Sequence, residues 1–233
     1  MKKLLVTTLA LTLVAGFLAC APASAAIVHV TYAGTVASGY DTTGIFGSAN
    51  TDLTGESFVS HYTFDTSVGY TSSNPTESTA AGGTFFPYAT PLLGATLTIH
   101  GQTVSVPGDY IGQIYGYNDG SSLSVISHAA EHVFDDGITK IDYSVTNGMY
   151  GYPGVGLPAS IDTSFTATSA GNIITGKFGL YVYDYVAQSY STYTEGNLTA
   201  ATVSVSVDTP EPASIAVLGA GLLGLGLVRR RRA

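Results

Sequence analysis

Residues 201–207 read Ala-Thr-Val-Ser-Val-Ser-Val, so that small or apolar side chains alternate with hydroxyl side chains. A period of two places the apolar side chains on one face of a β-strand and the hydroxyl side chains on the other. Antiparallel sheets with one buried face and one solvated face have this pattern. The stretch therefore predicts an antiparallel strand near the end of the folded part of the chain.

The same alternation recurs upstream of this stretch, in runs that turn residues separate. The runs lie at residues 28–32, 58–64, 97–106, 123–125, 140–145 and 180–186. His100-Gly101 and Asn118-Asp119-Gly120 interrupt the pattern with residues that favour tight turns. About ten strands of this kind in one domain predict an all-β fold. We expect an antiparallel β-sandwich of jelly-roll or immunoglobulin-like topology.

The first 25 residues have the organisation of a secretory signal peptide. Lys2-Lys3 precedes the apolar stretch Leu4–Leu18, and Ala23-Ser24-Ala25 offers a small-residue cleavage site before Ala26. We expect a signal helix, export through the Sec translocon, and cleavage between Ala25 and Ala26 by signal peptidase. Lipid attachment at Cys20 is the alternative to this cleavage.

The exported part of the chain is strongly acidic. Six of the eight basic residues lie in the terminal segments, which leaves Lys140 and Lys177 between residues 26 and 208. Fifteen of the sixteen acidic residues lie in the same range, so its formal net charge is −13. A surface without basic patches does not neutralise phosphates, which excludes nucleic acid as a partner. Cys20 is the one cysteine, so the domain has neither a disulfide nor a thiolate metal site.

Residues 210–233 have the organisation of a membrane anchor. Pro210, Glu211 and Pro212 precede the uncharged stretch Ala213–Val228, which four arginines follow: Arg229, Arg230, Arg231 and Arg232. As a transmembrane helix, residues 213–228 would span roughly 24 Å, short of the roughly 30 Å hydrocarbon core but enough where the bilayer thins. The arginines are expected to stay in the cytoplasm and to leave the domain outside.

This order of Pro-Glu-Pro, short Gly-rich apolar stretch, arginine cluster and chain end resembles the PEP-CTERM protein-sorting domain of Gram-negative bacteria that produce exopolysaccharide. The resemblance rests on Thr209-Pro210-Glu211-Pro212-Ala213-Ser214, the Leu/Gly run and the arginines, and Thr209 stands where the family usually has Val. It implies that an exosortase, a membrane-embedded cysteine transpeptidase, recognises Pro210, Glu211 and Pro212 and removes the tail nearby. It also implies an exported protein that is membrane-anchored before processing and then reaches the outer surface or the matrix. The same tail closes some proteins that carry an ice-binding label, which implies no activity.

His128-Ala129-Ala130-Glu131-His132 matches the H-x-x-E-H pattern of inverted zinc metallopeptidases. That chemistry needs His128 and His132 on one helical face, with Glu131 as the general base for a zinc-bound water. Glu195 has a suitable spacing for a third ligand. Strand and turn patterns flank the motif, so a connection between strands that holds two histidines is the competing interpretation.

Two further groups of residues suggest binding sites. Asn118-Asp119-Gly120, and Asp135-Asp136-Gly137 with Asp142, suggest calcium, although Asp and Asn also occur in turns for backbone reasons. Closely spaced tyrosines suggest either an aromatic face for sugar rings or ordinary half-exposed strands. These are Tyr181, Tyr183, Tyr185, Tyr190 and Tyr193.

The sequence thus predicts a signal peptide at residues 1–25, a β-sandwich ectodomain at 26–208 and a PEP-CTERM sorting signal at 209–233. We expect a non-enzymatic surface or extracellular-matrix protein of a biofilm, associated with exopolysaccharide and working without a cofactor unless calcium binds. One alternative is a calcium-stabilised glycan-binding module. The other is a secreted zinc hydrolase that uses His128, Glu131 and His132.

Overall fold

The described part of the chain is all β, as predicted. The computed structural model describes residues 26–151 and 156–208, which contain thirteen strands and no helix. Residues Ala26–Asp208 form one compact unit. The strands are β1 (Ile27–Asp41), β2 (Thr51–Asp52), β3 (Ser57–Asp65), β4 (Tyr70–Ser73), β5 (Glu77–Gly82), β6 (Leu92–Ile99), β7 (Gln102–Ser105), β8 (Ile111–Asn118), β9 (Ser124–Asp135), β10 (Thr139–Gly151), β11 (Phe165–Thr168), β12 (Asn172–Asp184) and β13 (Ser189–Asp208).

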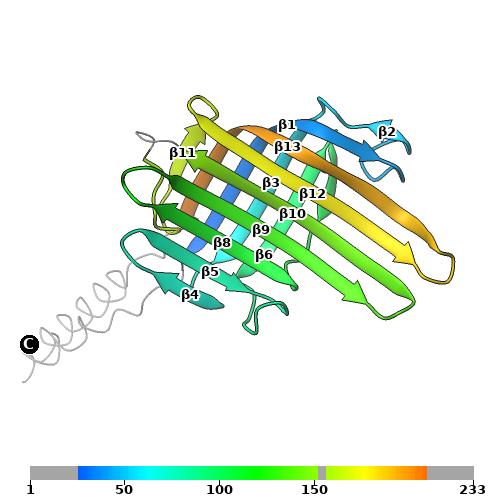
Figure 1. Cartoon of the computed structure of the whole chain (residues 1–233), viewed down its shortest axis with the longest axis horizontal. Helices are drawn as coiled ribbons and strands as arrows, with labels where there is room; N and C mark the ends of the chain where they lie inside the picture. The colour runs from blue at the N-terminus through cyan, green and yellow to red at the C-terminus, as the bar shows by residue number, and fades with distance from the viewer. Residues whose placement is uncertain (1–25, 152–155, 209–233) are drawn as a thin grey trace, which may run out of the picture. The chain divides into compact units, whose positions relative to one another are not determined.

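All thirteen strands belong to one sheet, in the order β4-β5-β8-β9-β10-β12-β13-β1-β3-β6-β7, with β11 paired to β13 and β2 to β1. The sheet curls, so that β1, β3 and β6 pass behind β8, β9, β10 and β12 (Figure 1). The expected sandwich of two separate sheets, with jelly-roll or immunoglobulin-like topology, is therefore not confirmed. Hydrogen bonding continues from the front layer to the back layer through β12, β13 and β1.

Irregular pairing between β1 and β13 accompanies this curl. The register shifts at Ala33/Gly34 and again at Val36/Ser38. The first shift leaves Ala201, between Ala200 and Thr202, without an opposite residue on β1. An extra residue of this kind bends a strand and increases its twist. The bend lets the long strands β1 and β13 run from one layer of the curled sheet into the other.

Gly34 lies at this bulge, where a side chain does not fit. A Cβ atom at residue 34 would lie 2.2 Å from the carbonyl oxygen of Thr199. We expect Gly34→Ala to lower the free energy of unfolding by about 2 kcal/mol, because the β1–β13 pair must shift. Gly94→Ala is the control, since residue 94 is exposed on β6 in open space and alanine there should leave stability equal or higher. Urea unfolding measures both, and equal stabilities would contradict this role of Gly34.

Two polar cross-links join the layers within the apolar core. The hydroxyl of Tyr32 on β1 lies 2.8 Å from Nδ1 of His128 on β9. Ser60 and Tyr62 on β3 donate hydrogen bonds of 2.6 and 2.8 Å to Oδ1 of Asn147 on β10. All five side chains are buried, and buried polar groups require hydrogen-bond partners. These bonds therefore fix how β1 and β3 face β9 and β10.

The alternating runs fall on most of the strands, and one run has the wrong phase. The hairpin at His100-Gly101 is confirmed, because both residues join β6 to β7 with positive φ angles of 51° and 77°. The run at Leu123 is out of phase: Leu123 is 42% exposed, while Ser124 and Ile126 face the core. Polar residues on the inner face of β9 hide its true register. None of the runs falls on the remaining strands, which are β2, β4, β5, β8 and β11.

Several predicted features fall outside the described residues. These are the signal helix at 1–25 with Ala25, the residues Pro210, Glu211 and Pro212, the transmembrane helix at 213–228, and the arginines at 229–232. Within residues 26–151 and 156–208, no helix is long and apolar enough to cross a membrane.

Candidate functional site

The two ends of the described domain lie side by side. Ile27, at the start of β1, pairs with Asp208, at the end of β13. The carbonyl oxygen of Ala26 accepts a hydrogen bond of 3.1 Å from the backbone N–H of Thr66. The residue after the expected signal cleavage site and the residue before the expected sorting signal are therefore neighbours. We call this end of the β1–β13 pair, from Ala26 to Asp208, the junction.

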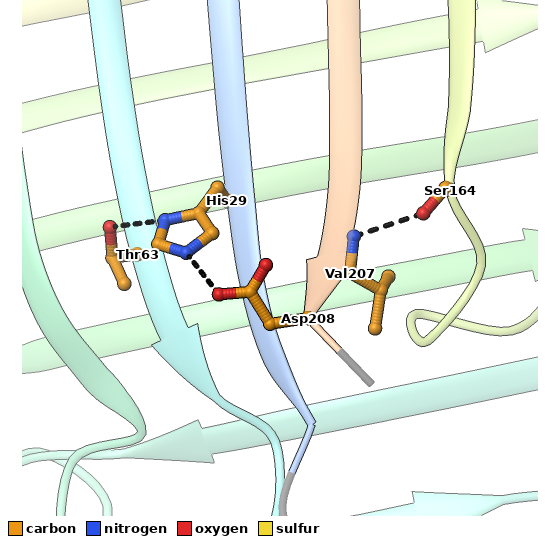
Figure 2. A network of polar contacts seen from close by, with 5 residues as sticks. All are labelled: His29, Thr63, Ser164, Val207 and Asp208. Carbon is orange, nitrogen blue, oxygen red and sulfur yellow. Dashed lines mark hydrogen bonds and ion pairs between the residues drawn. The ribbon is translucent and has the colours of Figure 1, made fainter. Parts of the chain in front are cut away.

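Side chains from both sides align the end of β13 at the junction (Figure 2). Nε2 of His29 on β1 lies 3.2 Å from Oδ2 of Asp208, and Nδ1 lies 3.2 Å from the hydroxyl of Thr63 on β3. On the opposite side, the hydroxyl of Ser164 accepts a hydrogen bond of 2.9 Å from the backbone N–H of Val207. The side chains of His29 and Asp208 are 45% and 69% exposed, so this pair contributes little stability. It joins the last residue of β13 to β1 by a side-chain contact.

The residues that follow the junction match a known family of sequence motifs. The family model of the PEP-CTERM protein-sorting motif matches residues 208–232. The chain carries a PEP-CTERM sorting motif. This motif indicates an exported protein that an exosortase processes and that is sorted to the cell surface, as the resemblance implied. A comparison with curated proteins found no match, and a comparison with solved structures found none either.

The PEP-CTERM motif begins within the fold. Its first residue, Asp208, is also the last residue of β13 and pairs with Ile27. Residue 209 alone separates β13 from Pro210. An exosortase that cuts near the Pro-Glu-Pro residues must therefore work within a few residues of the edge of the domain.

The His128-Ala129-Ala130-Glu131-His132 motif lies within β9, where a helix or a connection between strands was expected. Alternation along a strand turns His128 and Glu131 to opposite faces of the sheet. His128 is buried, and burial lowers its pKa to about 3. Nδ1 of His132 lies 2.6 Å from Oδ1 of Asp109. The helical arrangement that the zinc hypothesis needs is not formed.

Glu195, the suggested third zinc ligand, lies on β13 and serves another purpose. Its two carboxylate oxygens accept hydrogen bonds of 2.6 Å from the hydroxyl of Tyr181 and 3.2 Å from the hydroxyl of Tyr193. Among the described residues, no group of three His, Cys, Asp or Glu side chains could hold a metal ion.

The carboxylates of the suggested calcium loops accept hydrogen bonds within their own turns. Asp119 accepts bonds from the hydroxyl and backbone N–H of Ser122 and from the backbone N–H of Ser121, which hold its pKa far below the usual range. Asp136 accepts bonds of 2.8 and 2.7 Å from the backbone N–H groups of Ile138 and Thr139, and these lower its pKa. Both observations favour the turn interpretation over the calcium interpretation.

The closely spaced tyrosines lie together on the outer face of β12 and β13 and, for Tyr185, in the turn between these strands. Their ring centroids are 5.2 Å apart for Tyr181 and Tyr193, 4.9 Å for Tyr183 and Tyr190, and 5.0 Å for Tyr190 and Tyr193. Tyr185 continues the cluster at 5.2 Å from Tyr183. These residues therefore form one surface.

The side chains that meet at the junction could not be predicted from the sequence. His29, Thr63 and Ser164 belong to no motif, because β1, β3 and the segment before β11 supply one each. The sequence did contain one sign of the outer face, which is the pair of lysines in an otherwise acidic domain. Lys140 and Lys177 both lie on the outer face beside the tyrosines.

Proposed function

We propose that residues 26–208 are a non-enzymatic surface domain that an exosortase transfers from a membrane-bound precursor to the outer surface or the extracellular matrix of a Gram-negative cell. The observation that carries this proposal is the PEP-CTERM motif at 208–232, which starts at the last residue of β13. The proposal includes anchoring through residues 213–228 before processing, and association with the exopolysaccharide of a biofilm after it.

The fold is suited to losing its tail. β13 pairs with β1, with β11 and with β12, all of which lie between residues 26 and 208. Cleavage near Pro210, Glu211 and Pro212 therefore removes none of the thirteen strands of the described sheet. Because Ile27 pairs with Asp208, the two ends of the domain can stay paired after both terminal segments are removed.

The positions of the suggested catalytic residues support a non-enzymatic role. His128 cross-links the two layers through Tyr32, and Glu195 fixes two tyrosine rings. Each has a structural task that accounts for its place in the sequence. A surface or matrix domain therefore explains these residues better than a hydrolase does.

We expect Glu211→Ala to abolish removal of the tail, because it replaces the one charged residue of the Pro-Glu-Pro sequence. The intact mass of the protein, taken from membrane, surface and culture fractions, measures this. Wild-type protein should lack the segment beyond Pro212, whereas the variant should keep it and stay with the membrane. Glu77→Ala, which removes a carboxylate from the domain, is the control and should be processed like wild type.

Recovery of the full tail from wild-type cells would show a simple membrane anchor and refute exosortase processing. Added mass at the new end of the wild-type protein would identify a covalent attachment. Its absence would show that the protein is released.

A further inference from the structure

A groove crosses the outer face of β10, β12, β13 and β1. It consists of three adjoining hollows of about 520, 660 and 600 Å³. The first and second share Tyr181, and the second and third share Lys177 and Asn197. From Tyr183 to Thr175 the groove follows β12 for roughly 26 Å. We call this surface the outer groove, and the strands that form most of its floor lie side by side in Figure 1.

Fixed tyrosine rings line one end of the outer groove. The ring of Tyr181 lies over Gly179, where an added Cβ atom would be 2.6 Å from it. The hydroxyl of Tyr181 donates a hydrogen bond of 2.6 Å to Glu195, which also accepts one from Tyr193. Tyr190, 50% exposed, packs at 5.0 Å against Tyr193. Because the rings are held before any ligand arrives, binding to them costs little ordering entropy.

Positively and negatively charged side chains also line the outer groove. Lys140 lies with Asp142 at the tyrosine end, and Lys177 lies with Asp52 and Glu195 in the middle hollow. These lysines are the only Lys or Arg residues between 26 and 208, so every such cation of the domain lines this groove. The lining therefore offers hydrogen-bond donors beside acceptors along its length.

We propose that the outer groove binds an extended neutral glycan. Sugar rings have C–H faces that stack on aromatic rings, and hydroxyl groups that both donate and accept hydrogen bonds. The groove supplies aromatic rings at one end and both donors and acceptors beyond them. An acidic polymer would instead meet three carboxylates in the lining, on a domain of net charge −13. This inference goes beyond sorting and does not rest on it.

The position of the outer groove suits a tethered domain. Its tyrosine end lies at the β12–β13 hairpin, whereas the junction lies at the other end of β13. Between Tyr193 and Asp208 the strand runs for roughly 50 Å along its length. The glycan-binding end is thus remote from the place where the sorting tail is attached.

Affinity electrophoresis of the purified exported protein tests the proposal. The gels contain hydroxyethyl cellulose, dextran or galactomannan as neutral probes, and polygalacturonate as the acidic probe. We expect at least one neutral polymer to retard the wild-type protein, and Tyr181→Ala to weaken that binding about tenfold or more. Tyr70→Ala is the matched control, because Tyr70 is 47% exposed on β4 and lies outside the groove.

Three outcomes would overturn the proposal: no retardation by any neutral polymer, retardation by polygalacturonate alone, or equal retardation of wild type and Tyr181→Ala. The melting temperature of each variant shows that it is folded. If Tyr181→Ala does not fold, Tyr190→Ala takes its place, since this ring is half exposed and makes no hydrogen bond within the described residues. Tail removal is scored separately by mass, so failure of the groove and failure of sorting are distinguishable.

Discussion

Replacing Asp41 with alanine is expected to lower the free energy of unfolding by about 4 kcal/mol. The carboxylate of Asp41 is buried at the end of β1. It accepts hydrogen bonds of 2.8, 3.1 and 2.7 Å from the backbone N–H groups of Gly44, Ile45 and Phe46. A fourth bond of 2.5 Å comes from the hydroxyl of Thr194 on β13. Alanine would leave these donors without their acceptor and free the loop that follows β1.

The pKa of Asp41 reflects the same contacts. Burial opposes its ionisation, but the hydrogen bonds from Thr194 and from the backbone N–H groups outweigh burial and hold the pKa below its usual 3.8. The ionised form is thus the one that stabilises the fold. Its contribution is present above pH 3.8 and is lost as the pH falls through the lower folded-state pKa.

Urea unfolding at neutral pH measures the effect of Asp41→Ala. Asp52→Ala is the control from β2, the strand that follows this loop, because Asp52 is exposed and accepts one backbone bond of 2.8 Å from Thr54. It should change the free energy of unfolding far less than Asp41→Ala does. If Asp41→Ala does not fold, Asp41→Asn keeps the shape and should still lose about half as much. Equal losses of unfolding free energy at residues 41 and 52 would show that the buried carboxylate of Asp41 contributes no more than an exposed one.

The sequence predicted strands well and their curvature poorly, and the two outcomes have one cause. Side-chain alternation reports which face of a strand is buried, so the runs around Val30, Val145 and Val205 coincide with β1, β10 and β13. A bulge depends on how two strands pair. Ala201 follows the alternation of its stretch, yet the register shift leaves it exposed beside the buried Ala200. The single curled sheet could not be read from one strand at a time.

Polar residues in the core account for the error at β9. Ser124 and His128 face inward, so the strand lacks the apolar alternation that would reveal it. His128 is tolerated there because Tyr32 comes from a strand almost a hundred residues earlier in the chain. A contact across that separation leaves no mark in the sequence around His128.

The PEP-CTERM motif and the outer groove also differ in how far the sequence could predict them. The PEP-CTERM motif is one continuous segment, so its residues and its meaning could be read directly. The outer groove takes side chains from β1, β10, β12 and β13, which only folding brings together. The tyrosines were visible as a cluster because two of these strands form one hairpin. Asp52 and Lys177 could not be joined to them without the strand order.

The wild-type domain is expected to lose stability as the pH falls below 6.5, and His128 is expected to cause much of this loss. The side chain is 1% exposed, with the rings of Tyr62 and Phe64 both at 5.8 Å. Burial lowers its pKa from 6.5 to about 3, because a charged imidazole would be deprived of water. The folded domain therefore keeps His128 neutral, whereas the unfolded chain binds a proton there.

The sign of the pH dependence follows from this difference. Between pH 6.5 and 3 the unfolded state binds more protons, so each pH unit of acidification removes about 1.4 kcal/mol from the free energy of unfolding. The loss approaches about 5 kcal/mol at the acid end of this range. Protonation of Asp41 acts only below pH 3.8, so the two groups destabilise the fold in largely separate windows.

Urea unfolding at pH 7, 6, 5 and 4 measures the slope in wild type and in His128→Gln, which keeps a hydrogen-bonding side chain but does not titrate. The variant should start lower at pH 7, since glutamine fills the site imperfectly, and should then lose much less stability on acidification. His100→Gln is the control, because His100 lies on the exposed β6–β7 turn and pairs with Glu56 at the surface. Parallel slopes for wild type and His128→Gln would mean that carboxylates alone set the acid limit. A selective loss of slope at residue 128 would instead trace that limit to the Tyr32–His128 cross-link between the two layers.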